Sequence, residues 1–309
     1  MSQPLVSVVI IFLDAERFID EAVQSVLAQS YPNWELVLVD DGSTDASTAI
    51  ARQYASSTPE RIRYAEHPDH ENRGMAASRN LGVRRSSGEY VALLDADDVW
   101  LPDKLARQVV VLETEPRAAM VYGPAEWWYS WTGRPADAGR DFVHELGVEP
   151  NAPIEPPTLL ARFLADEGIS PCTCSMLIRR EAFDAVGGFE EAFRGLYEDQ
   201  AFCAKLCLES TVIAAGECLY RYRQHPNSAL YVAARVGTLQ AARATFLEWL
   251  ESYLASRRVP DGELWRVLER ERHTLHGRPG SPLPVGAAAV SRLVRSAAGR
   301  FLRGGDRHS

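Results

Sequence analysis

Short apolar runs alternate with amphipathic stretches along the first third of the chain. Residues 6–12 are apolar and mostly β-branched apart from Ser7. Residues 36–39 and 90–94 form two further apolar runs. Runs of this length predict strands that are buried on both faces. Between the first two runs, apolar side chains recur at helical spacing over residues 18–27. Strands that alternate with helices predict an α/β fold with a mostly parallel sheet.

The second half of the chain is less regular. Residues 133–157 are rich in Pro, Gly, Asp and Glu, which predicts a loop or a flexible insertion. The elements expected after it are a strand at residues 175–179, a helix at about 198–209, a strand near 218–222, and helices over 239–254 and 264–275. The pattern therefore predicts a sheet-bearing domain over residues 1–230 and a helical C-terminal extension over residues 231–309.

Composition limits the classes of function. Of the 309 residues, 46% are hydrophobic and 24% are charged, which fits a folded chain with a sizeable core and excludes a mostly disordered one. The net charge is −9, from 33 basic and 42 acidic residues. Binding to nucleic acid over a broad surface needs a basic footprint, so no nucleic-acid partner is expected.

The chain carries no targeting signal that we recognise. No stretch approaches the ~20 apolar residues of a membrane span, and the first residues lack the basic segment of a signal peptide. A cytoplasmic location is therefore expected, with the five cysteines as reduced thiols. Cys172 and Cys174 could form a zinc site with Cys203 and Cys207. Those last two fall within an apolar helical pattern, however, and cysteine is a common core residue, which favours the core interpretation.

Two acidic clusters follow directly on apolar runs. Residues 40–45 read Asp-Asp-Gly-Ser-Thr-Asp, and residues 95–98 read Asp-Ala-Asp-Asp. Ligands of α/β folds bind beyond the carboxyl ends of parallel strands, so both clusters should share one crevice. Asp95 and Asp97 on a tight turn suit a hard divalent cation, Mg²⁺ or Mn²⁺, with phosphate oxygens as its other ligands. The alternative is an N-terminal cap for a helix over residues 102–112.

Two common phosphate-binding motifs are absent from the sequence. The turn after the first apolar run is Leu13-Asp14-Ala15-Glu16, which has no glycine, and no Gly-x4-Gly-Lys-[Ser/Thr] sequence occurs. These observations exclude a dinucleotide-binding Rossmann domain and a P-loop nucleotide site. Phosphate must be bound in another way.

The order and spacing of the motifs resemble those of the family 2 glycosyltransferases with the GT-A fold. The resemblance covers about residues 4–230. It rests on five elements, namely the apolar strand from Val6, residues 40–45, Asn72-Arg73-Gly74 with Ser78-Arg79-Asn80-Leu81-Gly82, residues 95–98, and Glu198-Asp199. It implies a Rossmann-like, mostly parallel sheet flanked by helices. Residues 1–123 would form the nucleotide-sugar-binding half and residues 124–230 the acceptor-side half.

The resemblance implies roles for the residues around the donor. Asp40 and Asp41 would lie at the base and ribose of the nucleotide, Arg79 near the nucleotide, and Asp95 at the ribose. The family commonly has Pro-x-Tyr-Asn after the first strand, where this chain has Ile11-Phe12-Leu13-Asp14. Leu13 would therefore pack against the base without aromatic stacking. The alternatives are turn chemistry for the two aspartates and a surface position for Arg79.

The resemblance also implies the chemistry. Asp97 would bind the metal, and His225 would face the diphosphate or complete the metal shell, unless it is an ordinary loop histidine. Asp199 would be the catalytic base, the alternative being a carboxylate that stabilises a helix N-terminus. The acceptor-side candidates are Glu198, Trp127 and Trp128, although aromatic side chains are more often core residues.

The expected function is an inverting, metal-dependent transfer of a sugar from a nucleotide diphosphate donor, a UDP- or dTDP-sugar. The acceptor would be a hydroxyl of a carbohydrate, a lipid-linked or a small molecule. A catalytically silent nucleotide-sugar-binding protein on the same fold is the alternative, and a sugar nucleotidyltransferase is disfavoured because the Gly-rich phosphate loop is missing. Residues 285–302 have the pattern of a basic amphipathic helix, which either makes peripheral contact with a membrane or caps the protein's own core.

Overall fold

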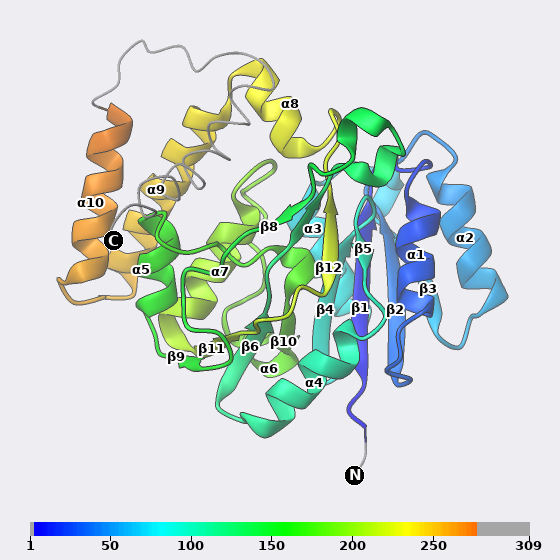
Figure 1. Cartoon of the computed structure of the whole chain (residues 1–309), viewed down its shortest axis with the longest axis horizontal. Coiled ribbons are helices and arrows are strands. Elements are labelled where there is room, and N and C mark those ends of the chain that lie inside the picture. Colours follow the sequence, from blue (N-terminus) through cyan, green and yellow to red (C-terminus); the bar gives the residue numbers. More distant parts are fainter. Residues whose placement is uncertain (1–2, 277–309) are drawn as a thin grey trace, which may run out of the picture. The chain divides into compact units, whose positions relative to one another are not determined.

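A computed structural model describes residues 3–276 of the chain. The chain divides into two compact units, residues 1–163 with 167–224 and residues 164–166 with 225–309. All strands of the described chain belong to the first unit (Figure 1). The longer segment of the second unit begins at His225, and the sequence predicts the C-terminal extension from residue 231.

The apolar runs form the first half of a large sheet. Its strands are β1 (Val6–Phe12), β2 (Trp34–Asp40), β3 (Ile62–Glu66) and β4 (Tyr90–Asp95). They pair in parallel in the order β3-β2-β1-β4. The helices between them are α1 (Ile19–Leu27), α2 (Ser47–Ser57) and α3 (Met75–Arg84) (Figure 1). Every residue of β1 and β2 is buried, which explains why both are largely continuous apolar runs.

The second half of the sheet is mixed. β10 (Leu177–Arg179) runs antiparallel between β4 and β6 (Ala118–Tyr122). β11 (Thr211–Ala214) is parallel to β6, and β9 (Pro153–Ile154) forms the antiparallel edge. The remaining helices of this region are α4 (Lys104–Thr114), α5 (Thr158–Leu164), α6 (Arg180–Ala185) and α7 (Glu198–Glu209). The predicted mostly parallel sheet flanked by helices is confirmed.

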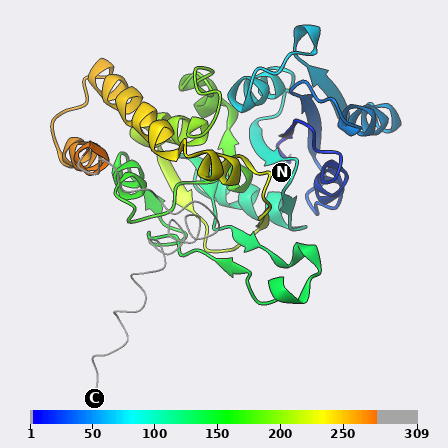
Figure 2. The same cartoon turned by 90° about the horizontal axis from the view of Figure 1, so that it is seen from above.

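A second, four-stranded sheet has the order β5-β12-β7-β8. Its strands are β5 (Val99–Trp100), β12 (Tyr220–Arg223), β7 (Glu126–Trp128) and β8 (Phe142–Val143). The segment from β7 to β8 extends as an arm, drawn in green in Figure 2. The predicted loop over residues 133–157 is wrong in part, because it contains β8 and β9, which pair with neighbouring strands. Strands of two residues are too short to produce a recognisable period in the sequence.

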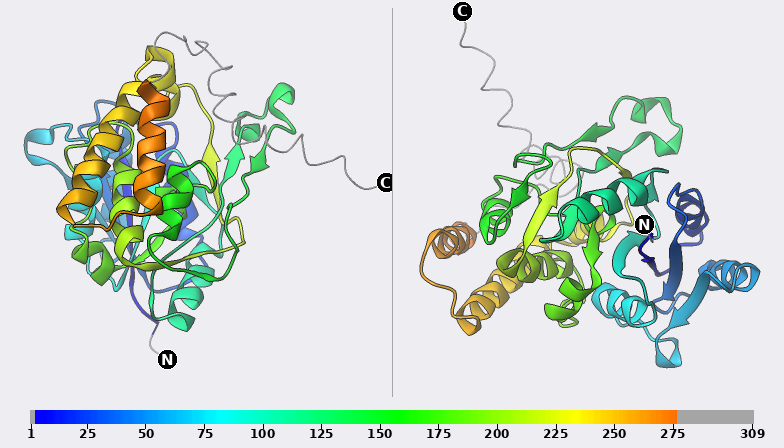
Figure 3. Two further views of the ribbon diagram at one scale, coloured as in Figure 1. Left: turned by 90° about the vertical axis from the view of Figure 1, so that its left-hand side faces the viewer. Right: turned by 90° about the horizontal axis from the view of Figure 1, so that it is seen from below.

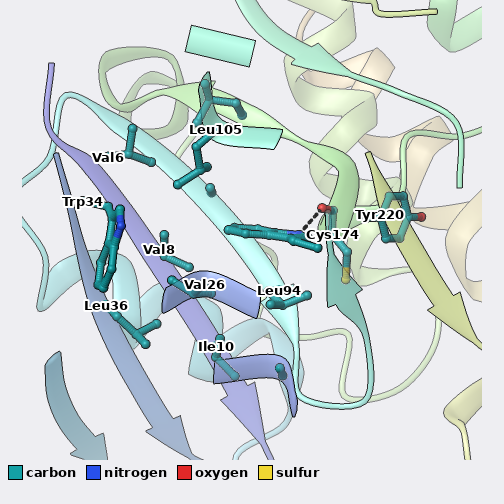
Figure 4. Packing of buried hydrophobic residues seen from close by; sticks show 14 of the residues in the cluster. Val6, Val8, Ile10, Val26, Trp34, Leu36, Leu94, Leu105, Cys174 and Tyr220 are labelled. Carbon is teal, nitrogen blue, oxygen red and sulfur yellow. Dashed lines mark hydrogen bonds between the residues drawn. The ribbon is translucent and has the colours of Figure 1, made fainter. Parts of the chain in front are cut away.

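The core of the first unit packs between the large sheet and its helices. Figure 4 shows Val8 and Ile10 of β1 next to Val26 of α1, and all three side chains are fully buried. The indole N–H of Trp100 donates to the carbonyl of Cys174, at 2.8 Å, which fixes the segment that precedes β10 (Figure 4). Cys203 and Cys207 are buried, unbridged residues of α7, as the core interpretation predicts.

The second unit is helical where it is described, as predicted for the C-terminal extension. It contains α8 (Ala229–Val236), α9 (Leu239–Ser256) and α10 (Glu263–His276). α9 and α10 lie side by side (Figure 3), and an ion pair joins Arg243 to Glu271 at 3.1 Å. Within residues 3–276, no helix combines the length and apolarity that crossing a membrane requires. The proposed amphipathic helix over residues 285–302 lies outside the described residues.

Candidate active site

The loop after β1 is fastened to the turn after β2. The backbone N–H of Asp14 donates to Ser43 Oγ at 3.1 Å, and the Asp14 carboxylate accepts from the N–H of Thr44 at 2.7 Å. Asp14 has a left-handed backbone, with φ of +47°, a conformation that aspartate tolerates better than most residues. This arrangement leaves Leu13 beside it with 46% of its surface exposed, so a ligand can reach the leucine.

Asp40 is the last residue of β2, and its carboxylate bonds within the protein. It is fully buried and accepts hydrogen bonds from the N–H of Ser43 at 2.8 Å and from Thr48 Oγ1 at 2.5 Å. The Tyr64 hydroxyl, which lies closer to Glu66, is 3.1 Å from the same carboxylate. These bonds hold the turn together, which is the turn chemistry considered as the alternative. Contact of Asp40 with a base or ribose stays a prediction.

Asp41 joins the same turn to the start of α3. Its carboxylate accepts from the N–H of Arg73 at 2.8 Å, from the N–H of Gly74 at 3.0 Å and from Ser78 Oγ at 2.9 Å. At the next position, Gly42 has φ of +90°, and a Cβ there would lie 2.9 Å from the backbone of residues 70 and 72. The Asp41-Gly42 turn therefore packs directly on the segment that leads into α3.

Arg79 of α3 lies at the centre of the site. It is 2% exposed, so the alternative of a surface position is wrong. Its guanidinium donates through Nη2 to Asp95 Oδ1 at 2.8 Å and through Nη1 to Glu198 Oε1 at 2.7 Å. Burial lowers the pKa of Arg79, but the two carboxylates outweigh that effect and raise it. Arg79 thus joins the end of β4 to the start of α7.

Glu198 and Asp199 open helix α7, directly after Tyr197, whose backbone is left-handed with φ of +74°. Burial and the neighbouring Asp199 raise the pKa of Glu198 to about 7, although Arg79 lowers it. Burial also raises the pKa of Asp199, while Arg79 lowers it and Asp95 raises it. These mutual effects show that Asp95, Arg79, Glu198 and Asp199 form one electrostatic cluster. Because Glu198 bonds to Arg79, its prediction as an acceptor-side residue has no support from this geometry.

The Asp95–Asp98 turn presents carboxylates at the end of β4. Asp97 is half-buried, and Asp98 is only 1% exposed. The Asp98 carboxylate accepts from the N–H of Arg223 at 2.9 Å, and within residues 3–276 its Oδ2 has no hydrogen-bond partner. Ligand atoms of Asp95, Asp98 and Cys174 lie within 4.8 Å of one another. Carboxylates with an unsatisfied buried oxygen fit a divalent cation.

The turn of residues 95–98 does not cap helix α4. α4 begins at Lys104, and Asp103 is its N-cap residue, without a side-chain hydrogen bond to the helix. Burial, followed by the neighbouring Asp97 carboxylate, raises the pKa of Asp98 well above the ordinary aspartate value. A cation at this turn would remove that cost by keeping the carboxylates charged.

The two tryptophans of β7 lie in different surroundings. Trp127 packs against Phe142, with ring centroids 5.6 Å apart, and against Tyr222 at 5.4 Å. Trp128 instead packs on the Arg223 guanidinium, whose carbon is 4.5 Å from the ring centroid. Arg223 also donates through Nε to the backbone carbonyl of Asp97 at 2.7 Å. Trp128 therefore has a link to the Asp97 turn, whereas Trp127 belongs to an aromatic cluster.

His225 is the first residue of the second unit after β12. It is buried, and its backbone carbonyl accepts from the N–H of Ser228 at 3.2 Å. Its assignment as a metal ligand stays a prediction.

Several residues of the site were not predicted from the sequence. They are Tyr64, His70, Ser78, Asp98, Cys174 and Arg223. Asp98 and Ser78 stand inside motifs that the sequence analysis quoted, so proximity to Asp97 and Arg79 was a usable signal. The other four come from distant segments, and only the fold brings them to the two acidic turns.

The sequence matches the model of a known protein family. The family model described as glycosyl transferase family 2 matches residues 7–187, more than half of the chain. The chain belongs to glycosyltransferase family 2. It is 42% identical to EpsE of Bacillus subtilis over 112 residues, 36% of this chain and 40% of EpsE. It is 46% identical to TuaG of the same bacterium over 109 residues, 35% of this chain and 41% of TuaG. The matches thus span less than half of these relatives.

Two solved structures share the fold of this chain. TarS from S. aureus in complex with UDP-GlcNAc has a TM-score of 0.66 at 18% identity, over 96% of this chain and 80% of that one. The mannosyltransferase PcManGT from Pyrobaculum calidifontis, in complex with GDP-Man and Mn²⁺, has a TM-score of 0.59 at 22% identity. The match covers 98% of this chain and 80% of that one. These likenesses confirm the GT-A fold of this glycosyltransferase family 2 chain.

Proposed function

We propose that this family 2 chain is an inverting glycosyltransferase that uses a nucleotide diphosphate sugar, with a UDP- or dTDP-sugar favoured. The observation that carries the proposal is the Arg79 bridge, because it brings the Asp95 turn and the Asp199-bearing helix to the same guanidinium. Two neighbours of the same fold bind UDP-GlcNAc and GDP-Man, which supports a nucleotide-sugar donor.

The donor would bind across the ends of β1, β2 and β4. Leu13 offers an exposed apolar side chain for the base, next to the turn that Asp40 and Asp41 organise. Asp95 is the part-exposed carboxylate on the same edge, suited to accept from a ribose hydroxyl. Trp128 and the arm from β7 to β8 would lie on the side of the donor away from Leu13, where the sugar meets the acceptor.

The Asp97 carboxylate would hold a divalent cation, Mg²⁺ or Mn²⁺, together with the Asp95 and Asp98 carboxylates of the same turn, whose ligand atoms lie within 4.8 Å of one another. Such a cation supplies Lewis-acid stabilisation of the negative charge on the leaving diphosphate. A neighbour of the same fold is in complex with Mn²⁺, which supports a metal in this class. Arg223 holds the backbone of Asp97 and the carboxylate of Asp98, and so keeps the turn in one conformation.

Asp199 is the proposed general base. The acceptor oxygen bonds to the anomeric carbon while the bond from that carbon to the phosphate oxygen breaks, and the electron pair leaves with the diphosphate. Asp199 takes the acceptor proton. Its raised pKa makes it a stronger base than an ordinary aspartate. Attack opposite the leaving group inverts the configuration.

The first experiment is a thermal-shift panel of UDP, dTDP, GDP and their sugars, with and without Mg²⁺ or Mn²⁺. A ligand at about 100 times its dissociation constant stabilises the protein by about 2.7 kcal/mol. We expect a metal-dependent rise in Tm with at least one uridine or thymidine compound, and turnover or donor hydrolysis with the matching sugar. Binding without either reaction, across many acceptors, would instead indicate a silent nucleotide-sugar-binding protein.

Replacing Asp97 by Asn should abolish the metal dependence of donor binding. An amide is neutral and binds a hard divalent cation far more weakly than a carboxylate does. Calorimetric titration of the nucleotide with and without the metal measures the effect. Asp184→Asn is the control, because Asp184 is an exposed residue of α6. Unchanged metal dependence in Asp97→Asn would contradict the assignment of this ligand.

A further inference from the structure

A strained turn lies just before Arg73 and Gly74, whose backbone N–H groups donate to Asp41. The short 3-10 helix η1 (Pro68–His70) contains two consecutive residues with left-handed backbone, Asp69 with φ of +58° and His70 with φ of +55°. Such a conformation costs energy for a residue other than glycine and persists where other contacts hold it. Two backbone hydrogen bonds, from His70 to His67 at 3.1 Å and from Glu71 to Pro68 at 3.3 Å, hold this turn together with the contacts of the His70 ring.

Both ring nitrogens of His70 face oxygen atoms that can only accept. Nδ1 lies 2.9 Å from Glu66 Oε2, and Nε2 lies 2.8 Å from the backbone carbonyl of Ser43. A neutral imidazole has one N–H and one lone pair, so it can donate to only one of the two. The charged imidazolium donates to both, and this is the form that the geometry fits.

The charged groups around the ring favour that form. The Ser43 carbonyl and then the Glu66 carboxylate raise the pKa of His70 above 6.5, with partial burial opposing them and Asp40 of β2 adding to them. Arg52 of α2 lies 3.4 Å from Glu66, and the Tyr64 hydroxyl bonds to Glu66 at 2.6 Å. Tyr64 and Arg52 both favour the charged Glu66 carboxylate, and its pKa is lowered.

The partner of His70, Ser43, belongs to the turn proposed to receive the donor. Its N–H donates to Asp40, and its hydroxyl accepts from the N–H of Asp14. The backbone of Gly42 packs against the carbonyl of His70 itself. A change in the His70 ring therefore acts on the turn at the ends of both β1 and β2.

We propose that the imidazolium of His70 is a positioning residue of the donor site, where it holds the turn of residues 40–44 in the conformation that binds the nucleotide. This inference rests on the proposed donor site. The folded protein favours the charged ring. Both hydrogen bonds of the ring are therefore fully formed below pH 6.5, the ordinary pKa of histidine, and one of them is lost as the pH rises through the raised pKa of His70. Donor affinity should fall over that interval.

The test measures binding of UDP with Mg²⁺ by calorimetry at about pH 6 and about pH 8.5. Three proteins are compared, the wild type, His70→Asn and Glu66→Gln. Asparagine tolerates the left-handed backbone, so His70→Asn removes the ring with little added strain. Comparing each variant with the wild type at the same pH cancels the ionisation of UDP itself.

At about pH 6, His70→Asn should bind UDP about three- to tenfold more weakly than the wild type, the coupling expected of a group that acts through one hydrogen bond. At about pH 8.5 the two affinities should converge. Glu66→Gln keeps an acceptor oxygen but removes the charge, so its loss of affinity should occur at lower pH than in the wild type. His273→Asn, at an exposed position of α10, is the control and should change nothing.

A titration of the His70 ring by NMR in the ligand-free protein gives a second readout, and we expect a pKa above 6.5. A ring that titrates at or below the ordinary value would overturn the inference. So would a His70→Asn protein that binds UDP as the wild type does at both pH values. A wild type that binds none of UDP, dTDP and GDP would contradict the proposed function, whereas nucleotide binding unaffected by His70 would contradict only its positioning role.

Discussion

The Asp199→Asn variant is expected to lose most of its turnover while it still binds the donor. Removal of a general base typically costs ~10²–10⁴-fold in rate. Asparagine has the shape of aspartate, and Asp199 Oδ1 accepts only from the N–H of Gln200 among the hydrogen bonds described, so the local fold should survive. Steady-state kinetics gives kcat, and calorimetry gives the donor Kd separately.

Glu198→Gln is the matched control for this experiment. Glu198 is adjacent on the same helix, but its carboxylate bonds to Arg79, and glutamine keeps an oxygen that can accept from that guanidinium. We expect a smaller effect on kcat, with a change in stability or in the acceptor KM instead. A near-normal kcat in Asp199→Asn would contradict the mechanism, even though the fold and the family would stand.

Replacing Arg79 by Met should destabilise the protein by about 3–5 kcal/mol, because it leaves Glu198 and Asp95 without their shared cation in a buried site. Urea denaturation followed by circular dichroism measures the change in the free energy of unfolding. Arg79→Lys keeps the charge but cannot bridge two carboxylates with one planar group, so it should recover part of the loss.

Arg84→Met is the control on the same helix. Its ion pair with Glu191 spans 3.6 Å, and both side chains are largely exposed, so less than about 1 kcal/mol should be lost. Equal destabilisation by the changes at residues 79 and 84 would contradict the view that Arg79 joins β4 to α7. Each prediction thus tests a contact that a different part of the site supplies.

The sequence predicted the parallel half of the sheet because burial on both faces produces nearly continuous apolar runs. β1 and β2 are such runs, and both acidic turns stand at the ends of strands, as expected. Residues 133–157 were described less well, because β8 and β9 are only two residues long. Their place depends on hydrogen bonds to distant strands, which leave no local period in the sequence.

The candidate site was predicted by motif rather than by contact. The sequence indicated Arg79 and Asp199 as functional residues, but it did not reveal that Glu198 would bond to the arginine. Likewise, His70 stands in an unremarkable polar stretch, and only the backbone conformation brings its ring to Ser43. Contacts between segments far apart in the chain depend on the finished fold, so a single sequence leaves them undetermined.

The reversed strand β10 also has a consequence for the order in which the chain can assemble. β4 is complete at Asp95, yet its second neighbour begins only at Leu177. During synthesis, one edge of β4 therefore has no partner while the intervening segment is made. One edge of β6 is also unpaired until β10 has been made, because β10 pairs with both strands. Unpaired strand edges invite association with other chains. Fragments that stop before residue 177 should aggregate. A fragment that contains β4 and β6 but lacks β10 is therefore a poor candidate for separate expression.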